Sequence, residues 1–169
     1  LVESSVYLAN SADSYWILDE DLRPIVNTKY PYMRYLDTDL MAVSNGNNWY
    51  LFIPSKFEYY NHEFERCDLE SAHRSSIIIR DEDKLYLWSK KSNKLFPEPF
   101  KSIESVWNDN GEFYIVSKKN KYGILDSSLK YIQYCQHDSI ENLGSFYRFS
   151  NNGMFGIMNG KGIIVLDEE

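Results

Sequence analysis

The fold of this chain is decided by a recurring stretch that is clearest in FYIVSKKNKYGILD, residues 113–126. Two runs of aromatic and aliphatic residues flank the polar sequence SKKN, a pattern typical of two antiparallel strands joined by a tight turn. Similar stretches lie at residues 6–19, 40–53, 76–89 and 146–159. The sequence therefore predicts five β-hairpins.

The spacing within these hairpins is constant. An aromatic residue recurs in the second strand at intervals of 34, 37, 36 and 33 residues, and each lies eight residues after an apolar residue of the first strand. The pairs are Tyr7 and Tyr15, Met41 and Trp49, Ile78 and Tyr86, Tyr114 and Tyr122, and Tyr147 and Phe155. Because a one-residue slip would turn every side chain to the other face, a fixed spacing indicates a fixed hairpin register.

A third apolar stretch follows each hairpin, at residues 24–26, 57–60, 95–96, 131–132 and 163–166. We therefore predict an all-β fold of five repeated antiparallel β-meander units of about 33–37 residues, forming a single domain over residues 1–169. One such unit cannot bury its own apolar face, so neighbours must stack on one another. The chain starts with the first strand of a hairpin and ends after a third strand of the repeat, so its two ends can meet and close a ring. This favours a propeller-like ring over an open twisted stack.

Composition supports strands over helices. Aromatic residues make up 16% of the chain, with 14 Tyr, nine Phe and four Trp, whereas Ala occurs four times. Aromatic side chains suit the pleated, half-buried surface of a sheet, and Ala is the strongest helix former. An all-α fold is excluded on these grounds.

Two stretches, KYGILDSSLKYI (residues 121–132) and MFGIMNGKGIIV (residues 154–165), resemble the WG (KWG) repeat family of bacterial proteins. The matching residues are Tyr122, Gly123, Ile124, Leu125 and Asp126 in the first and Phe155, Gly156, Ile157 and Met158 in the second. The other three repeats depart from the family, because Trp16, Tyr50 and Leu87 stand where its Gly belongs. The resemblance implies a non-catalytic β-repeat scaffold used for binding.

The net charge of the chain indicates which kinds of partner it can attract. Lys and Arg number 18 against 25 Asp and Glu, a net charge of −7. This charge repels phosphate backbones and anionic lipid heads, so neither nucleic acid nor a membrane surface is an expected partner. It attracts a basic protein and raises the rate of encounter with it.

The motifs of catalysis and metal binding are absent. His62, His73 and His137, together with Cys67 and Cys135, fit no common metal-ligand spacing, and we expect free thiols and no metal or other cofactor. Neither a GxSxG elbow nor a phosphate-binding Gly loop occurs. We predict that the protein is not an enzyme, although a triad assembled from distant residues stays open.

Two segments depart from the repeat and are predicted to bind the partner, because scaffolds place recognition on such loops. In residues 56–76 the candidate residues are Tyr59, Tyr60, Glu63, Glu65, Asp68 and Glu70, and in residues 107–111 they are Trp107 and Asp109. Aromatic anchors ringed by charge are typical of an interface that selects a basic partner. The alternative is a continued third strand, a short surface helix at residues 63–70 and a Trp107 that caps the core.

The function predicted from these features is that of an acidic bacterial immunity protein, an antitoxin that binds and neutralises a basic nuclease-type toxin and is a monomer when free. The alternative is an exported domain that binds carbohydrate or the cell envelope, and a carboxylate-based hydrolase ranks third. No apolar run reaches the length of a membrane span. We expect a cytoplasmic location, while the absence of an initiator Met leaves an exported protein with a removed signal as the alternative.

Overall fold

The computed structural model describes residues 7–11, 14–25 and 29–167. Predicted strand and turn positions at Val6, Ala12, Asp13 and Val26 lie outside these residues. The chain divides into two compact units, unit 1 with residues 1–72 and 80–82 and unit 2 with residues 73–79 and 83–169. The prediction of a single domain stays a prediction.

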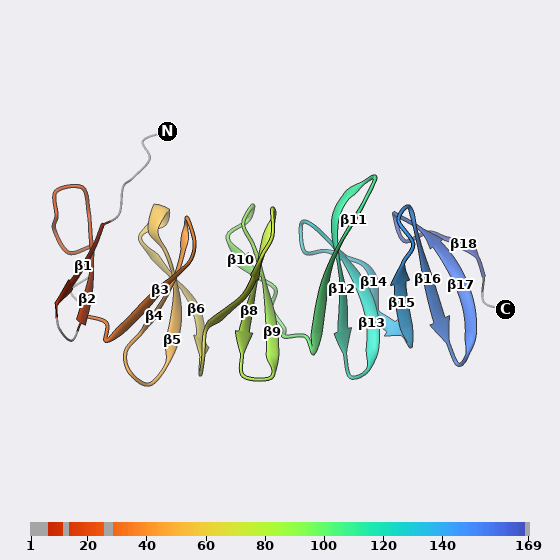
Figure 1. Cartoon of the computed structure of the whole chain (residues 1–169), viewed down its shortest axis with the longest axis horizontal. Coiled ribbons are helices and arrows are strands. Elements are labelled where there is room, and N and C mark those ends of the chain that lie inside the picture. Colours follow the sequence, from red (N-terminus) through yellow and green to blue (C-terminus); the bar gives the residue numbers. More distant parts are fainter. Residues whose placement is uncertain (1–6, 12–13, 26–28, 168–169) are drawn as a thin grey trace. The chain divides into compact units, whose positions relative to one another are not determined.

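The strands form five antiparallel sheets, and each sheet consists of strands that are consecutive along the chain (Figure 1). The first sheet pairs β1 (Tyr7–Ser11) with β2 (Ser14–Leu18), and the second contains β3 (Tyr32–Asp37), β4 (Leu40–Ser44), β5 (Trp49–Ile53) and β6 (Glu58–Phe64). A 3-10 turn, η1 (Pro54–Lys56), separates β5 from β6. The third sheet contains β7 (Asp68–Ala72), β8 (Ser76–Asp81), β9 (Lys84–Ser89) and β10 (Lys94–Leu95).

Unit 2 also holds the fourth and fifth sheets. The fourth contains β11 (Ser102–Asn108), β12 (Gly111–Lys118), β13 (Lys121–Asp126) and β14 (Tyr131–His137). The fifth contains β15 (Ser139–Asn142), β16 (Phe146–Asn151), β17 (Met154–Asn159) and β18 (Ile164–Leu166). The predicted all-β fold of five repeated antiparallel meanders is confirmed.

The predicted number of three strands per repeat is wrong for four of the five sheets. Four of the sheets have a fourth strand that precedes the predicted hairpin, namely β3, β7, β11 and β15. These are edge strands that leave many side chains in solvent, so their apolar pattern is weak.

The predicted hairpin register is confirmed in four repeats. The aromatic residues pair with the residue five positions earlier, as Asn10 with Tyr15, Ser44 with Trp49, Ser117 with Tyr122 and Ser150 with Phe155. The polar turns carry the residues that tolerate a left-handed backbone, for example Asn120 at φ 63° and Asn152 at φ 49°. Local turn chemistry and strand register therefore agree.

The central strands of the second, third and fourth sheets largely bury both faces, whereas β16 and β17 of the fifth sheet leave Phe146, Arg148 and Phe155 exposed on one face. In β12, Tyr114 and Val116 pack in one apolar cluster with Ile78 and Leu87, whereas Phe113 and Ile115 pack in another with Tyr147. In unit 1 a third cluster joins Ile17, Met41, Val43 and Phe52. Closure of the five sheets into a ring stays a prediction.

Two local expectations were wrong. Residues 56–76 are not an irregular connection, since they form β6 and β7 with a three-residue link at 65–67, and the alternative of a short helix at 63–70 is wrong for the same reason. Residues 107–111 are not an insertion, because Trp107 and Asn108 are the last two residues of β11 and residues 109 and 110 make the turn to β12. No helix in the described part of the chain is long and apolar enough to cross a bilayer.

Candidate functional site

The candidate site is a tyrosine-rich cleft in unit 1, of about 420 Å³. It lies along β6 and is lined by Tyr30, Asn45, Tyr50, Tyr59, Tyr60 and Glu63. We call it the tyrosine cleft. A volume of this size is within the range of pockets that hold a small ligand or a long side chain.

Packing holds the aromatic wall of the tyrosine cleft in place. The Tyr59 ring lies 5.1 Å from the Phe52 ring and 6.4 Å from the Tyr30 ring, between centroids. Phe52 is fully buried, yet Tyr59 keeps 40% of its surface exposed. The cleft therefore offers a ring that is already ordered, which lowers the entropy lost when a partner binds.

Neutral donors fix the carboxylate of the tyrosine cleft. Tyr50 Oη donates to Glu63 Oε1 at 3.1 Å, and Asn48 Nδ2 donates to Glu63 Oε2 at 3.1 Å. Since neither donor carries a charge, Glu63 is oriented without being neutralised. An anion beside aromatic faces is a suitable site for a cationic side chain.

His62 also lines the tyrosine cleft. Its ring lies 4.5 Å from the Phe64 ring, and burial lowers the pKa of His62, an effect that the nearby Asp81 carboxylate partly opposes. The imidazole is therefore neutral at physiological pH, and Glu63 supplies the charge of the cleft.

Of the predicted residues in β6 and β7, the structure brings together Tyr59, Tyr60 and Glu63. Asp68 makes an ion pair with Arg34. Glu70 accepts two hydrogen bonds from Arg80, at 2.7 and 2.8 Å, and this guanidinium lowers the pKa of Glu70. Their charges are offset locally, whereas Glu65 is exposed at the β6–β7 link.

The other two predicted residues, Trp107 and Asp109, belong to unit 2. Trp107 is 51% exposed, so it does not cap the core. Asp109 accepts a hydrogen bond from Ser145 Oγ at 2.7 Å.

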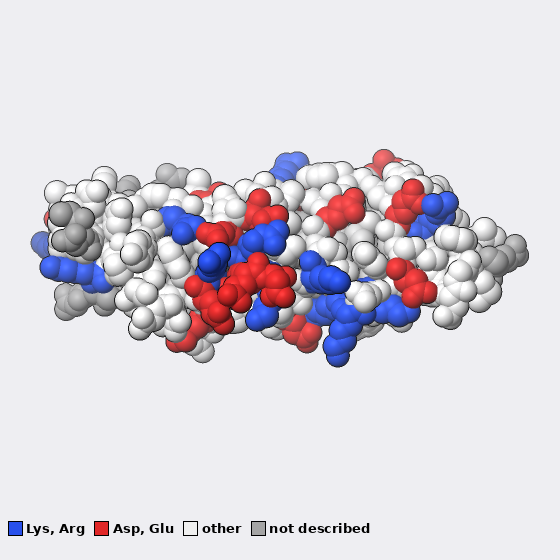
Figure 2. All heavy atoms as spheres, turned by 60° about the horizontal axis from the view of Figure 1, so that its bottom comes forward, with Lys and Arg blue, Asp and Glu red and all other residues white. Residues whose placement is uncertain are grey.

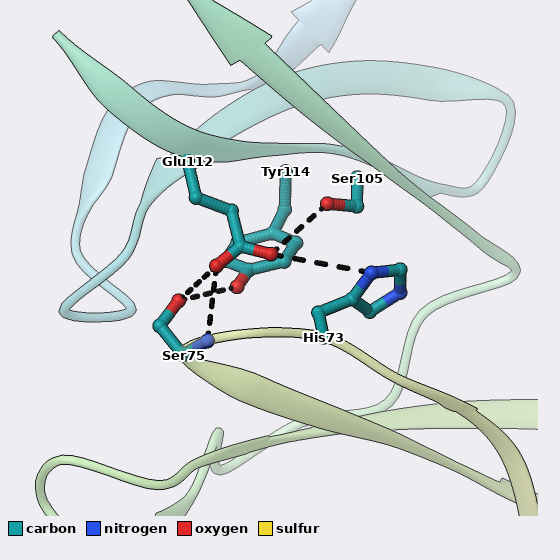
Figure 3. A network of polar contacts seen from close by, with 5 residues as sticks. All are labelled: His73, Ser75, Ser105, Glu112 and Tyr114. Carbon is teal, nitrogen blue, oxygen red and sulfur yellow. Dashed lines mark hydrogen bonds and ion pairs between the residues drawn. The ribbon is translucent and has the colours of Figure 1, made fainter.

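A buried carboxylate in unit 2, Glu112, organises a network that the sequence analysis missed (Figure 3). Glu112 is 5% exposed and accepts hydrogen bonds from the Ser75 backbone N–H at 3.1 Å, from Ser75 Oγ and from Ser105 Oγ at 3.2 Å. Ser75 Oγ also lies 2.9 Å from Tyr114 Oη, and His73 Nδ1 lies 4.0 Å from Glu112 Oε1.

The Glu112 network has the residue types of a Ser-His-Glu triad but not its order of contacts. In a triad the imidazole stands between the hydroxyl and the carboxylate and takes the proton of the hydroxyl. Here Ser75 Oγ bonds directly to Glu112 (Figure 3). The arrangement ties the β7–β8 loop to β12 and provides no relay through His73.

The cysteines and histidines form no metal site in the described ranges, where no group of three or more His, Cys, Asp or Glu side chains is arranged to hold an ion. Cys67 and Cys135 are both free thiols. Cys67 is buried, and burial raises the pKa of its thiol to about 12.

The two units differ in charge. Unit 1 contains fourteen Asp and Glu against six Lys and Arg, a balance of −8, whereas unit 2 contains eleven against twelve, a balance of +1. Figure 2 shows a face on which acidic and basic side chains lie intermixed. The net negative charge of the chain is therefore a property of unit 1.

No family model matches the chain, and no curated protein matches it by sequence. Among solved structures, Hsv2 from Kluyveromyces lactis is similar at a TM-score of 0.33 and 14% identity, over 97% of this chain and 60% of that one. PorZ, a surface component of the type-IX secretion system of Porphyromonas gingivalis, is similar at a TM-score of 0.33 and 9% identity, over 97% of this chain and 26% of that one. The chain thus spans about three fifths of Hsv2 and a quarter of PorZ, and these weak similarities carry no functional argument.

Proposed function

We propose that the protein is a non-catalytic binding module that captures a basic protein, and that this partner is a nuclease-type bacterial toxin which the module neutralises as an immunity protein. The proposal rests on one observation, the concentration of negative charge in unit 1 together with an ordered tyrosine cleft. Nucleases carry basic surfaces because they bind phosphate chains, so an acidic inhibitor gains both steering and specificity.

The tyrosine cleft gives this proposal a concrete contact. A Lys or Arg side chain of the toxin packs against the exposed Tyr59 ring and ends at Glu63, which lies on the same face of the sheet because the two residues pair with Phe52 and Tyr50. Tyrosine is enriched among the residues that dominate binding energy in interfaces, and Tyr59 is ordered before binding. Glu65, which is exposed, then adds to long-range attraction, whereas the acids of β7 add little because Arg34 and Arg80 offset their charges.

The proposal is tested with a nuclease domain encoded beside this gene, by measuring association and dissociation rates and inhibition of the nuclease. We expect Tyr59→Ala to weaken binding by about tenfold or more, chiefly through faster dissociation. We expect Glu63→Gln to slow association and to reduce its dependence on salt. Glu141→Gln removes the same charge from an exposed carboxylate of unit 2 and serves as the matched control.

Two results would overturn the proposal. One is a neighbouring nuclease that is neither bound nor inhibited. The other is an inhibitor whose affinity is unchanged by Tyr59→Ala and Glu63→Gln, since the tyrosine cleft would then have no part in binding.

A second candidate, carbohydrate binding, is favoured by the polar lining of the same cleft. Asn45 and Asn61 lie beside the Tyr rings and Glu63, and aromatic faces with amide and carboxylate groups suit a sugar ring and its hydroxyls. A glycan array separates the two candidates: saturable binding of a glycan that is lost in Tyr59→Ala would assign the tyrosine cleft to sugar.

A further inference from the structure

We propose that unit 2 holds a second binding site, for a small phosphate monoester that carries a flat ring, such as a nucleoside monophosphate. The site is a pocket of about 470 Å³ lined by Arg74, Ser75, Lys90, Lys91, Trp107, Glu112 and Ser127. We call it the Arg74 pocket. All of these residues belong to unit 2, so the site is separate from the tyrosine cleft.

The loop that carries Arg74 is held on two sides. Glu112 accepts hydrogen bonds from both the backbone N–H and the hydroxyl of Ser75 (Figure 3), and the backbone N–H of Lys90 donates to the Ser75 carbonyl at 3.0 Å. The main chain next to Arg74 is therefore fixed, and the β9–β10 turn that carries Lys90 and Lys91 is fixed to it. Cations placed on an ordered frame bind an anion at a smaller entropic cost.

The charge at the Arg74 pocket is positive. Three cationic side chains line it, and Arg74 and Lys91 are both exposed. The one carboxylate, Glu112, is buried and accepts hydrogen bonds from Ser75 and Ser105. The exposed Arg74 guanidinium, together with the exposed Lys91 ammonium, suits the several oxygens of a phosphate monoester, which Arg can bind in a bidentate manner.

Trp107 supplies the surface for the ring. It pairs directly with Glu112 across β11 and β12, and directly opposed residues of an antiparallel pair point to the same face of the sheet. Trp107 is 51% exposed, although its indole is large and apolar. Stacking of a base or aryl ring on this indole would bury that surface.

The size and surroundings favour a small molecule over a polymer. A cavity of about 470 Å³ is within the range of small-ligand sites. A long polyanion would need an extended basic surface, whereas unit 2 as a whole has a charge balance of only +1. Ser127 adds a hydroxyl for the sugar or phosphate. It lies on the β13–β14 turn, which is ordered because Asp126 Oδ1 accepts hydrogen bonds from the backbone N–H groups of Ser128 and Lys130.

The test titrates the full chain with AMP and with phenyl phosphate, by calorimetry and by tryptophan fluorescence. Inorganic phosphate tests the charge alone, adenosine tests the ring alone, and single-stranded DNA tests the polymer. We expect saturable binding of the two monoesters, at least tenfold tighter than that of phosphate or adenosine. Arg74→Gln and Trp107→Leu should each weaken it by about tenfold, while Lys161→Gln, an exposed lysine of unit 2 outside the Arg74 pocket, should leave it unchanged.

Several outcomes would overturn the proposal. The proposal fails if neither monoester binds saturably at millimolar concentration, or if AMP and inorganic phosphate bind with equal affinity. It also fails if single-stranded DNA binds more tightly than AMP. Finally, it fails if the affinity is unchanged in both Arg74→Gln and Trp107→Leu. Both side chains are exposed, so the variants should unfold at the temperature of the parent chain, which circular dichroism checks.

Discussion

Glu63 in unit 1 and Glu112 in unit 2 both accept hydrogen bonds from neutral groups, but they differ in exposure. Glu63 lies at the exposed surface of the tyrosine cleft, whereas Glu112 is 5% exposed and lines the Arg74 pocket. The first carboxylate is available to a cation from outside, and the second holds a loop of its own unit. With balances of −8 and +1, one unit is strongly acidic and the other is nearly neutral, a difference that the net charge of the chain conceals.

The units also differ at one position of the repeat. Tyr50 in β5 and Gly123 in β13 both follow the recurring aromatic residue, yet one is a wall of the tyrosine cleft and the other has no side chain. At Gly123 the backbone of the neighbouring strand β14 approaches closely, and the β13–β14 register shifts there. In these two repeats the residue type at this position therefore decides between an aromatic ring and a close strand contact.

The largest expected effect is that of Gly123→Ala. A Cβ at this position would lie 2.5 Å from the Gln133 carbonyl oxygen and 2.7 Å from the Cys135 nitrogen, so β14 must move. We expect a loss of about 3–5 kcal/mol in the free energy of unfolding, measured by denaturant titration. Gly156→Ala is the matched control, because there the closest atoms belong to the Phe149 ring, and we expect a smaller loss. Equal losses would contradict the role given to the backbone of β14.

Next in size is the contrast between Glu112→Ala and Glu63→Ala. Removing Glu112 leaves the Ser75 N–H and the Ser75 and Ser105 hydroxyls without their acceptor in a partly buried setting, at a cost of about 2–3 kcal/mol. Glu63 is exposed, so its removal should cost less than about 1 kcal/mol. Denaturation curves measure both, and similar losses would show that burial does not separate the two carboxylates.

The hairpins could be predicted because their two strands are central in the sheets. Such strands bury at least one face completely, so residues like Met41, Tyr114 and Tyr147 on the buried face must be large and apolar, and the eight-residue spacing follows from register. The preceding edge strands could not be predicted in this way. In β7, for example, the sequence DLESA leaves Leu69 exposed and pairs Glu70 with Arg80, so no apolar alternation marks it.

The candidate sites were predictable only in part. Tyr59, Tyr60 and Glu63 lie on one strand, so their grouping is visible in the sequence. Tyr30 and Asn45 reach the same cleft from distant segments, and Glu112 meets Ser75 from 37 residues away. Among the lining residues outside β6, only Tyr50 carried a signal in the sequence, because it stands where the WG repeat that the sequence resembles has Gly.

A smaller effect separates the two thiols at alkaline pH. Burial raises the pKa of Cys67 to about 12, above its value in an unfolded chain, so the folded state binds a proton that the unfolded state loses. The stability that this group contributes is present below pH of about 8.5 and is lost as pH rises toward 12. We expect the free energy of unfolding to fall more steeply between pH 9 and about 11 in the parent chain than in Cys67→Ala. Burial also raises the pKa of the half-buried Cys135 thiol in unit 2, so Cys135→Ala should flatten the fall in the same direction but less than Cys67→Ala. A steeper fall in Cys67→Ala than in the parent would contradict the prediction.

The smallest effect concerns the exposed ion pairs. Arg80 pairs with Glu70 in unit 1 and Arg148 pairs with Glu141 in unit 2, and all four side chains are about half in solvent. Exposed pairs of this kind add little to stability, so neither Arg80→Ala nor Arg148→Ala should shift the denaturation midpoint measurably. Arg80→Ala nevertheless adds a net negative charge to the unit that already carries −8, and it releases Glu70. If unit 1 steers a basic partner, Arg80→Ala should raise the association rate by about twofold at low salt and Arg148→Ala should raise it less. Equal increases would mean that the partner responds to the charge of the whole chain, and the electrostatic distinction between the two units would then have no role in recognition.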